Sequence, residues 1–381
     1  MKFRVDRDVL ADTVAWVARS LPNRPSLPVL AGMLIEARDG EIVFSGFDYE
    51  TSARVSVPAE VAVEGTALVS GRLLADISRS LPAQPVDITA EGGKVVVTCR
   101  SARFTVQTLP TEDYPELPEM PTASGTVKAD VFAHAVGQVA VAAGRDDMLP
   151  VLTGVRIEIE GSSVTLAATD RYRLAVREFT WTPERPDMSA TALVPARVLA
   201  DTAKAFASGS EITIALANPG SGTGEGLIGF AGSTGAVMRR TTTRLLEGEF
   251  PKYRTLFPAE QQTIARVETG PFVESLKRVA LVAERNTPIR LTLDDGIATL
   301  EAGSSDEAQA SESIEASIEG EPLTIGFNPH YLLDGLSAID APMAQFAFTQ
   351  PTRPAVLTGV SESSEPESDY RYLLMPVRLQ H

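Results

Sequence analysis

Apolar residues recur at helical spacing in several separate segments of the chain. In residues 7–20, RDVLADTVAWVARS, the side chains of Val9, Leu10, Val14 and Val17 fall on one stripe of a helical wheel. We therefore expect amphipathic helices that bury one face. The predicted helices span residues 7–20, 71–80, 130–145, 196–206, 272–285 and 329–338.

Between these segments, apolar and polar residues alternate or β-branched residues dominate, which is typical of strands. Examples are EIVFSGFD (41–48), VDITAEGGKVVVTC (86–99) and RFTVQTL (103–109), and Gly, Pro and Asp turn signals separate them. Strands joined by such short turns form mainly hairpins. The pattern therefore predicts an α+β fold in which helices pack on antiparallel sheets.

The chain also repeats itself. LPVLAGMLIEARDGEIVFSGFD (27–48) matches LPVLTGVRIEIEGSSVTLAATD (149–170) at a constant offset of 122 residues. LVSGRLLADISRSL (68–81) matches LVPARVLADTAKAF (193–206) at an offset of 125. A fainter third copy starts near residue 272, where FVESLKRVA again precedes a proline turn and two strands. Periods of this length indicate repeated whole domains rather than a solenoid of short repeats.

Three repeats of about 127 residues account for the 381 residues of the chain. We expect each repeat to hold two helices and about six to eight strands. The predicted domain limits are residues 1–121, 122–258 and 259–381.

Composition narrows the class of protein. Hydrophobic residues make up 44% and charged residues 22%, which is typical of globular proteins. No apolar run approaches the roughly 18 residues that span a bilayer, and MKFRVDRDVL carries charges where a signal peptide is apolar. We therefore expect a cytoplasmic protein with no membrane partner. Cys99 lies in a β-branched run without a nearby histidine, which indicates a buried structural thiol.

The sequence holds no set of residues typical of a catalytic site. The P-loop, GxSxG and HExxH motifs and a Cys/His metal cluster are absent, and His134, His330 and His381 are scattered. GEGLIG (224–229) matches GxGxxG, but strand-like segments flank it on both sides, which favours a hairpin loop over a dinucleotide site. We expect no enzyme activity, no metal and no cofactor; a nucleotide-binding enzyme is the alternative.

The net charge of −16 argues against a nucleic-acid partner unless the charges are segregated. The six predicted helices hold ten Lys/Arg and eight Asp/Glu, so the rest of the chain carries −18. Arg72 and Arg79 lie seven residues apart, as do Arg197 and Lys204, which places each pair on one helix face. Arg24 follows the first helix in a proline-fixed turn. We interpret these residues as a surface for a polyanion; a solvated helix face is the alternative.

Several unrelated segments, in this order, resemble the signatures of one family: MKFRVDRDVL (1–10), NRPSLPVLAG (23–32), TLPTEDYPELP (108–118), AATDRYRLAV (167–176), EGEFPKYRTLFP (247–258) and YLLMPVRL (372–379). Over essentially its whole length the chain resembles the beta subunit of bacterial DNA polymerase III, the sliding clamp of replication. The resemblance implies the DNA clamp fold with three similar domains. It also implies a head-to-tail homodimer whose six domains form a ring around double-stranded DNA.

The resemblance implies a non-catalytic processivity factor that contacts mainly phosphates, so that it slides without sequence specificity. The expected DNA-binding residues are Arg24, Arg72, Arg79, Arg197 and Lys204. Ring closure implies a heterologous interface between the first repeat and the partner's third repeat. We expect Ile77, Leu81, Phe104, Leu281 and Val282 there, with an ordinary core position as the alternative for each. An acidic interaction scaffold with the same fold, encircling no DNA, is the alternative function.

The family's partner site is an apolar cleft between the second and third repeats. It receives short linear motifs of the replicative polymerase alpha subunit, the clamp loader, repair polymerases, ligase and mismatch-repair proteins. Carried over by motif, the cleft comprises Leu152, Thr169, Arg171, Tyr172, Arg173, Leu174, Pro251, Leu256, Met375, Pro376, Val377, Arg378 and Leu379. The family often has Gly and His where this chain has Arg171 and Tyr172, so these two residues narrow or charge the rim.

Overall fold

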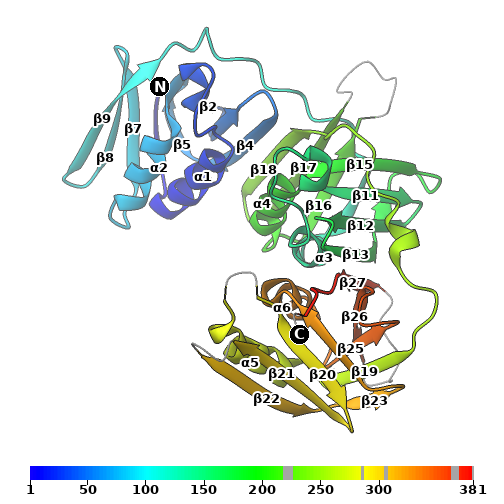
Figure 1. Cartoon of the computed structure of the whole chain (residues 1–381). Coiled ribbons are helices and arrows are strands. Elements are labelled where there is room, and N and C mark those ends of the chain that lie inside the picture. Colours follow the sequence, from blue (N-terminus) through cyan, green and yellow to red (C-terminus); the bar gives the residue numbers. More distant parts are fainter. Residues whose placement is uncertain (218–225, 285–286, 304–307, 362–368, 380–381) are drawn as a thin grey trace. The chain divides into compact units, whose positions relative to one another are not determined.

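The computed structural model describes residues 1–217, 226–284, 287–303, 308–361 and 369–379, and the chain divides into two compact units (Figure 1). The first compact unit comprises Met1–Ala133, Trp181–Met188 and Ala200–Leu245. The second compact unit comprises His134–Thr180, Ser189–Leu199 and Leu246–His381. The middle repeat therefore contributes segments to both units.

The described residues form six α-helices, two in each repeat, as predicted: α1 (Arg7–Arg19), α2 (Gly71–Ser80), α3 (Ala129–Ala140), α4 (Ala196–Phe206), α5 (Thr269–Val279) and α6 (Pro329–Ser337). Short 3-10 turns are η1 (Pro28–Ala31), η2 (Pro150–Thr153), η3 (Tyr253–Leu256) and η4 (Ala280–Val282).

Two helix limits differ from the prediction. The helix expected over 130–145 ends at Ala140 because the chain turns there and the Gly144 N–H donates to the Leu152 carbonyl at 2.7 Å. The helix expected over 272–285 begins at Thr269, since Pro271 lies in its first turn, where the missing N–H costs no hydrogen bond. Its α-helical part ends at Val279, and residue 285 lies outside the described residues.

One antiparallel sheet runs through the first compact unit in the order β14-β10-β16-β17-β18-β4-β3-β2-β6-β9-β8-β7-β1-β5. Its strands are β1 (Lys2–Val5), β2 (Gly32–Arg38), β3 (Glu41–Phe47), β4 (Thr51–Pro58), β5 (Glu60–Val63), β6 (Gly65–Ser70), β7 (Val86–Glu91), β8 (Lys94–Cys99), β9 (Ala102–Leu109), β10 (Gly125–Lys128), β14 (Thr182–Pro183), β16 (Glu211–Leu216), β17 (Leu227–Thr234) and β18 (Val237–Arg244). The β18–β4 pair joins the first repeat to the second, and Ser52 and Thr242 share a hydroxyl hydrogen bond of 2.7 Å there.

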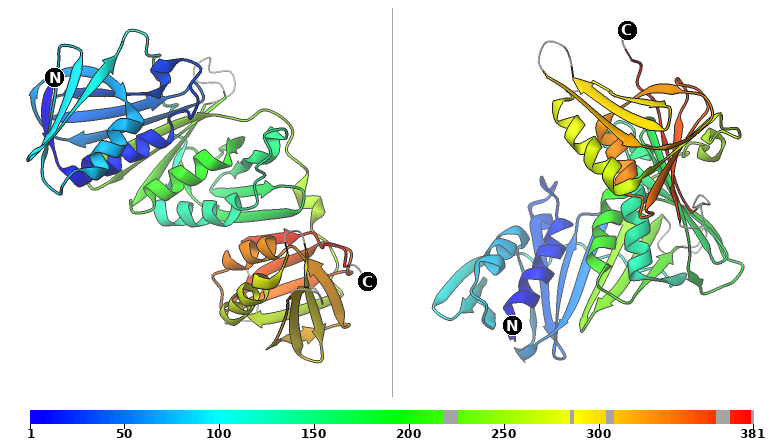
Figure 2. Two further views of the ribbon diagram at one scale, coloured as in Figure 1. Left: turned by 60° about the vertical axis from the view of Figure 1, so that its left-hand side comes forward. Right: turned by 90° about the horizontal axis from the view of Figure 1, so that it is seen from below.

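Helices α1 and α2 lie side by side against this sheet, and Figure 2 shows them from two further directions. The Asp6 carboxylate caps α1 by accepting the N–H groups of the next turn, at 2.8 Å from Asp8. Leu10, Val14 and Val17 then point into the core and are fully buried. Each such side chain contributes about 1.5–3 kcal/mol by leaving water. The same core holds Cys99, a free thiol that is 1% exposed, as predicted.

The second compact unit contains two antiparallel sheets, ordered β15-β11-β12-β13-β27-β26-β25-β19-β23 and β22-β21-β20-β24. Their strands are β11 (Gly154–Glu160), β12 (Ser163–Thr169), β13 (Arg173–Thr180), β15 (Ser189–Pro195), β19 (Thr263–Glu268), β20 (Ile289–Asp294), β21 (Ile297–Gly303), β22 (Gln309–Glu315), β23 (Ser317–Glu319), β24 (Leu323–Phe327), β25 (Met343–Phe348), β26 (Ala355–Val360) and β27 (Tyr370–Leu374). The β13–β27 pair, with Arg173 opposite Leu374, joins the second repeat to the third. The predicted class of helices on antiparallel sheets is confirmed.

The segment GEGLIG belongs to a hairpin over its described part. Residues 224 and 225 lie outside the described residues, Gly226 has φ +73°, and β17 follows at once and pairs antiparallel with β16. A dinucleotide loop would lead into a helix, whose N-terminus binds the pyrophosphate. The strand that follows Gly226 therefore agrees with the predicted hairpin.

Candidate functional site

The turn between β12 and β13 is held by its own side chains. The Asp170 Oδ1 atom accepts the N–H groups of Tyr172 at 3.0 Å and Arg173 at 3.1 Å. The Thr169 hydroxyl donates to the Arg173 carbonyl at 2.7 Å and accepts the Arg171 N–H at 3.2 Å. Arg171 has φ +79°, in the left-handed region that favours glycine. The turn leaves the Arg171 and Tyr172 side chains exposed.

Arg173 begins β13 and its side chain is only 6% exposed. Its Nε lies 3.0 Å from the Asp170 carboxylate, Nη1 donates to Asp334, and its guanidinium carbon lies 4.2 Å from the centre of the Tyr331 ring. Burial alone lowers the pKa of Arg173, but the contacts with Tyr372, Asp334 and Asp170 outweigh burial and raise that pKa. Arg173 is therefore a permanent buried cation with two carboxylate partners.

Helix α6 supplies the other half of this cluster. The Asn328 side chain caps its N-terminus and accepts the Tyr331 N–H at 3.2 Å, which fixes the first turn. Tyr331 and Asp334 lie three residues apart, so both face β13. The Tyr372 hydroxyl donates to the Tyr331 carbonyl at 2.8 Å. A Cβ atom at Gly335 would lie 2.5 Å from the Tyr372 ring, so this close approach requires glycine.

A hollow of about 720 Å³ opens beside this cluster, entirely within the second compact unit; we call it the rim pocket. Its walls include Leu149, Leu152 and the rings of Tyr172 and Tyr331, whose centroids are 6.3 Å apart and nearly parallel. Arg145, Arg171 and Arg173 also line it. The rim pocket therefore combines an aromatic and aliphatic wall with fixed positive charge.

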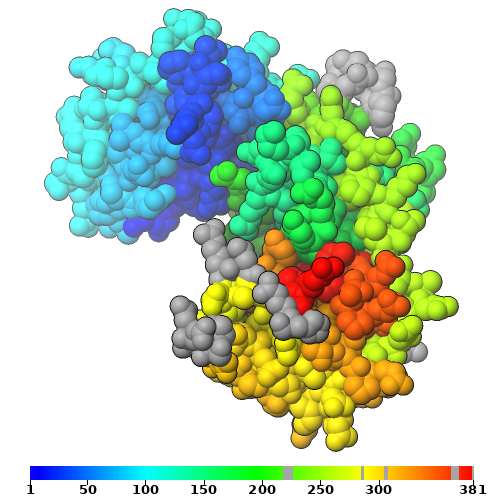
Figure 3. Space-filling view, viewed as in Figure 1, coloured from blue at the N-terminus to red at the C-terminus, as the bar shows by residue number. Residues whose placement is uncertain are grey.

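An apolar cluster lies next to the β13 strand. Leu174, Phe250 and Leu373 are buried in it, whereas Leu256 is 48% and Met375 39% exposed. The Met375 N–H donates to the Tyr172 carbonyl at 2.8 Å, which ties the end of the described chain to the turn. Figure 3 shows this end, in red, at the surface of the second compact unit.

The predicted cleft residues are thus partly brought together. Leu152, Arg171, Tyr172 and Arg173 line the rim pocket, and Thr169, Leu174 and Met375 adjoin it through the contacts above. Pro251 and Leu256 are exposed; each is followed or preceded in the chain by a residue of the apolar cluster, Phe250 before Pro251 and Phe257 after Leu256. The segment 376–379 continues along β24, since the Val377 N–H donates to the Gly326 carbonyl at 2.8 Å and the Leu379 side chain lies against Gly326. Pro376 and Val377 are half-buried there, and Arg378 is exposed.

Sequence reasoning missed nine residues that line the rim pocket: Ala143, Gly144, Arg145, Asp146, Leu149, Asp170, His330, Tyr331 and Asp334. Arg145 comes shortly before the repeated LPVLTG segment and Leu149 is the first residue of that segment. His330, Tyr331 and Asp334 belong to α6, which was predicted only as a helix. The apolar and charged residue types at the start of α6 were a usable signal, but only the fold brings them beside β13.

The five predicted DNA-binding residues, Arg24, Arg72, Arg79, Arg197 and Lys204, are all exposed. Arg72 donates to the Leu21 carbonyl at 3.3 Å and to the Asn23 side chain. The structure therefore places Arg72 against the loop that carries Arg24. Arg79 lies in the last turn of α2 and is exposed, whereas Leu74 on the same helix is buried.

The predicted interface residues fall into two groups. Ile77 and Leu81 are 5% and 4% exposed and belong to the core of the first compact unit, so the core alternative describes them. Phe104 on β9 is 37% exposed and Leu281 on η4 is 84% exposed. Val282 is half-buried and lines a hollow of about 320 Å³ with Leu281.

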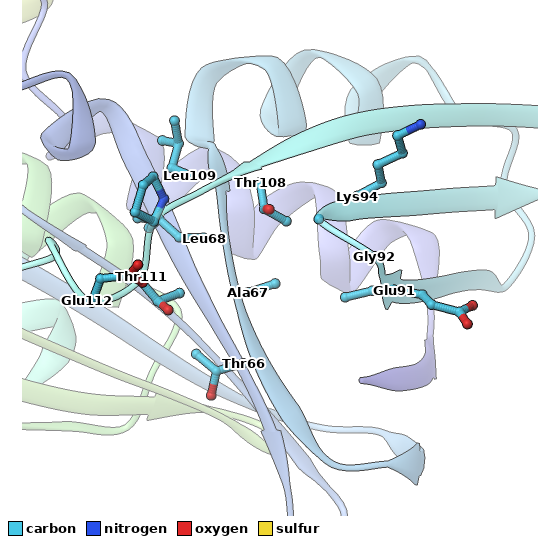
Figure 4. Close-up of a pocket in the computed structure, with 13 residues that line it drawn as sticks. Thr66, Ala67, Leu68, Glu91, Gly92, Lys94, Thr108, Leu109, Thr111 and Glu112 are labelled. Carbon is cyan, nitrogen blue, oxygen red and sulfur yellow. The ribbon is translucent and has the colours of Figure 1, made fainter.

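A second hollow, of about 490 Å³, lies in the first compact unit where β6, β8 and β9 diverge (Figure 4). Figure 4 shows Thr66, Ala67 and Thr108 among the residues that line it, together with Glu91 and Lys94. Glu91, Lys94 and Glu112 are the charged residues that line this hollow, beside a glycine turn and uncharged side chains, and it has no aromatic wall like that of the rim pocket.

Two kinds of site are not found within the described part of the chain. None of its helices is long and apolar enough to cross a membrane. Among the same residues, no group of three or more His, Cys, Asp or Glu side chains is arranged to hold a metal ion.

Comparison with known proteins gives one result along the whole chain. The family models for the N-terminal, central and C-terminal domains of the DNA polymerase III beta subunit match residues 1–118, 126–252 and 254–378. The beta sliding clamp of Streptomyces coelicolor is 64% identical over 380 residues, with 100% of each chain covered. A beta sliding clamp homolog, GriR, of Streptomyces muensis is 46% identical, with 99% of each chain covered. The crystal structure of the Bacillus subtilis DNA polymerase sliding clamp is 25% identical and superposes with a TM-score of 0.88 over 100% of each chain. The chain therefore belongs to the family of DNA polymerase III beta subunits, the beta sliding clamps, which are non-catalytic processivity factors.

Proposed function

We propose that two copies of this chain join head to tail and close a ring around duplex DNA. The observation that carries the proposal is the match of all three domain models in order along one chain, combined with cations exposed on the helices of a chain of net charge −16. Phosphates are the same at every base pair, so contacts to them allow sliding. The acidic remainder of the surface disfavours DNA elsewhere.

The proposed DNA-binding residues are Arg24, Arg72, Arg79, Arg197 and Lys204. All five are exposed, and contacts with phosphates need only their positive charge, not the exact geometry that base recognition requires. The test combines Arg24→Glu, Arg72→Glu, Arg79→Glu and Lys204→Glu in one variant. We expect about tenfold or greater loss of protein loaded by a clamp loader on nicked circular DNA, because log affinity falls with each phosphate contact removed. Loaded wild-type protein is released when the circle is linearised.

The matched control reverses exposed cations outside these helices and outside the proposed cleft, at Lys94, Arg290 and Arg353. This variant changes the net charge by a similar amount, so it measures the effect of charge alone. Normal loading of the helix variant, or equal loss in both variants, contradicts the proposed surface.

We propose that ring closure pairs two open sheet edges. Within the described residues, Ala102–Gln107 of β9 pair only with β8, and β22 pairs only with β21. Phe104 lies on the first edge, and the exposed Leu281 lies on η4, which contacts the neighbouring strand β21. A heterologous contact of this kind covers edges that would otherwise promote aggregation.

We propose that the rim pocket and the adjoining apolar residues Leu256 and Met375 receive short linear motifs of partner proteins. An exposed leucine and methionine beside a buried apolar cluster form an adaptable surface for such a peptide. The proposed partners are the replicative polymerase alpha subunit, the clamp loader, repair polymerases, ligase and mismatch-repair proteins, besides duplex DNA and a second copy of the chain.

We propose domain limits of 1–121, 122–258 and 259–381. The matched spans 1–118, 126–252 and 254–378 support limits near these positions. We also propose a cytoplasmic location, because the proposed ring encircles chromosomal DNA and its proposed partners replicate that DNA.

A further inference from the structure

The three carboxylates of the rim pocket already have partners. Asp170 accepts two backbone N–H groups through one oxygen and Arg173 through the other. Asp334 accepts Arg173. Asp146 accepts the backbone N–H of Met148 at 3.0 Å. Asp170 and Asp334 therefore share the one cation Arg173, and none of the three aspartates forms an ion pair with Arg145 or Arg171 among the described residues.

Two of the three arginines differ from Arg173 in this respect. Within the described part of the chain, the Arg145 and Arg171 side chains have no ion pair or side-chain hydrogen bond, and both are exposed. Arg145 lies close enough to Tyr331 to influence its hydroxyl electrostatically. Arg171 projects from the fixed turn after β12, next to Tyr172. The pocket thus presents two uncommitted guanidinium groups around the stacked Tyr172 and Tyr331 rings.

Guanidinium groups prefer carboxylates, which they can bind through two parallel hydrogen bonds, and aromatic faces accept the apolar side chains of a peptide. We propose that Arg145 and Arg171 select partner peptides that carry an aspartate or glutamate beside their apolar anchor, with Tyr172 and Tyr331 covering the anchor's flank. This inference rests on the proposed peptide-binding function of the same site, and it specifies in addition that the bound peptide carries a negative charge.

The probes are labelled decapeptides with leucine and phenylalanine anchors, each with aspartate at one flanking position, and twins with asparagine at that position. Fluorescence anisotropy measures their Kd for wild-type protein and for Arg171→Gly, Arg145→Gln and the double variant. We expect at least one aspartate peptide to bind wild type about three- to tenfold more tightly than its asparagine twin, as for an exposed pair of charged contacts. The double variant should bind both twins equally.

Arg353→Gln is the matched control, because it removes one exposed positive charge outside the pocket and should leave the preference intact. If aspartate and asparagine twins bind wild type equally at every position, the inference fails while the peptide site stands. If no peptide of the set binds wild type, the peptide site and the inference both fail. If Arg171→Gly weakens retention on circular DNA but not the aspartate preference, the arginines contact phosphate and the inference is overturned.

Discussion

Replacing Arg173 by methionine should loosen the contact between β13 and α6 and with it the second compact unit. Methionine keeps most of the apolar volume but removes the hydrogen bonds to Asp170 and Asp334 and the cation–π contact with Tyr331. The 13% exposed Asp170 loses a charge-assisted bond of about 1.5–3 kcal/mol. Asp334 is 42% exposed, so solvent screening limits the contribution of its ion pair with Arg173 to about 1 kcal/mol or less.

The cation–π contact adds about 0.5–1 kcal/mol, and relief of the buried charge offsets part of the loss. We therefore expect Arg173→Met to destabilise the β13–α6 contact by about 2–4 kcal/mol. Because a chain with two compact units need not unfold in one step, the assay is hydrogen–deuterium exchange of residues 170–174 and 329–336. Local opening should become about 30- to 1000-fold more frequent.

Asp334→Asn is the graded control for Arg173→Met, since it removes a charge at a half-exposed position and keeps the side-chain shape. It should raise exchange less than tenfold in the same segments. Exchange in Arg173→Met within a factor of about five of wild type would refute the assignment of Arg173 as the residue that holds α6 to β13.

Two further predictions concern the proposed assembly and cleft. Leu281→Glu should convert the dimer to soluble monomers in sedimentation equilibrium without changing the far-UV circular dichroism spectrum, because Leu281 is 84% exposed and contributes little to its own core; an unchanged dimer mass contradicts the interface. Met375→Asp should raise the Kd of apolar peptides, measured by fluorescence anisotropy, about tenfold or more while leaving the dimer intact, because the substitution puts a charge into the exposed apolar surface next to Tyr172. An unchanged Kd for those peptides contradicts the cleft.

The helices could be predicted from sequence because their signal is local. The expected limits 71–80 and 196–206 coincide with α2 and α4. The same pattern did not show which apolar residues of α2 stay exposed: Leu73 is 47% exposed, whereas Ile77 is in the core. That distinction depends on how α1 and the sheet surround the helix. A helical wheel defines an apolar arc but not the edge at which packing ends.

The strand pairings that join the repeats could not be predicted from the sequence. Strand β4 pairs with β18 through residues about 190 apart, such as Ser52 and Thr242, and each strand alone has an ordinary half-buried pattern. The rim pocket could not be predicted for the same reason, because Arg145 and Tyr331 come from segments that are distant in the sequence. Family resemblance supplied the β12–β13 turn by its motif, but not the residues that α6 brings to it.

The repeat itself separates what is structural at Arg171 from what is specific to this site. In the first repeat, Asp48 accepts the N–H groups of Glu50 and Thr51 at 2.9 and 2.7 Å, and Tyr49 has φ +74°. The second repeat builds the same turn, with φ +79° at Arg171. The left-handed conformation is therefore a property of the repeated fold, tolerated by two quite different side chains.

What distinguishes the second copy of the turn is the charge of its side chain. Arg171→Gly removes the charge and relieves the backbone, whereas Arg171→Asn removes the charge and keeps a residue that tolerates the left-handed region. If the guanidinium selects the peptide, both variants should lose the aspartate preference to the same extent. If only the glycine variant loses it, rigidity of the turn rather than its charge determines the preference. The two substitutions thus separate backbone conformation from side-chain chemistry at a position where the fold couples them.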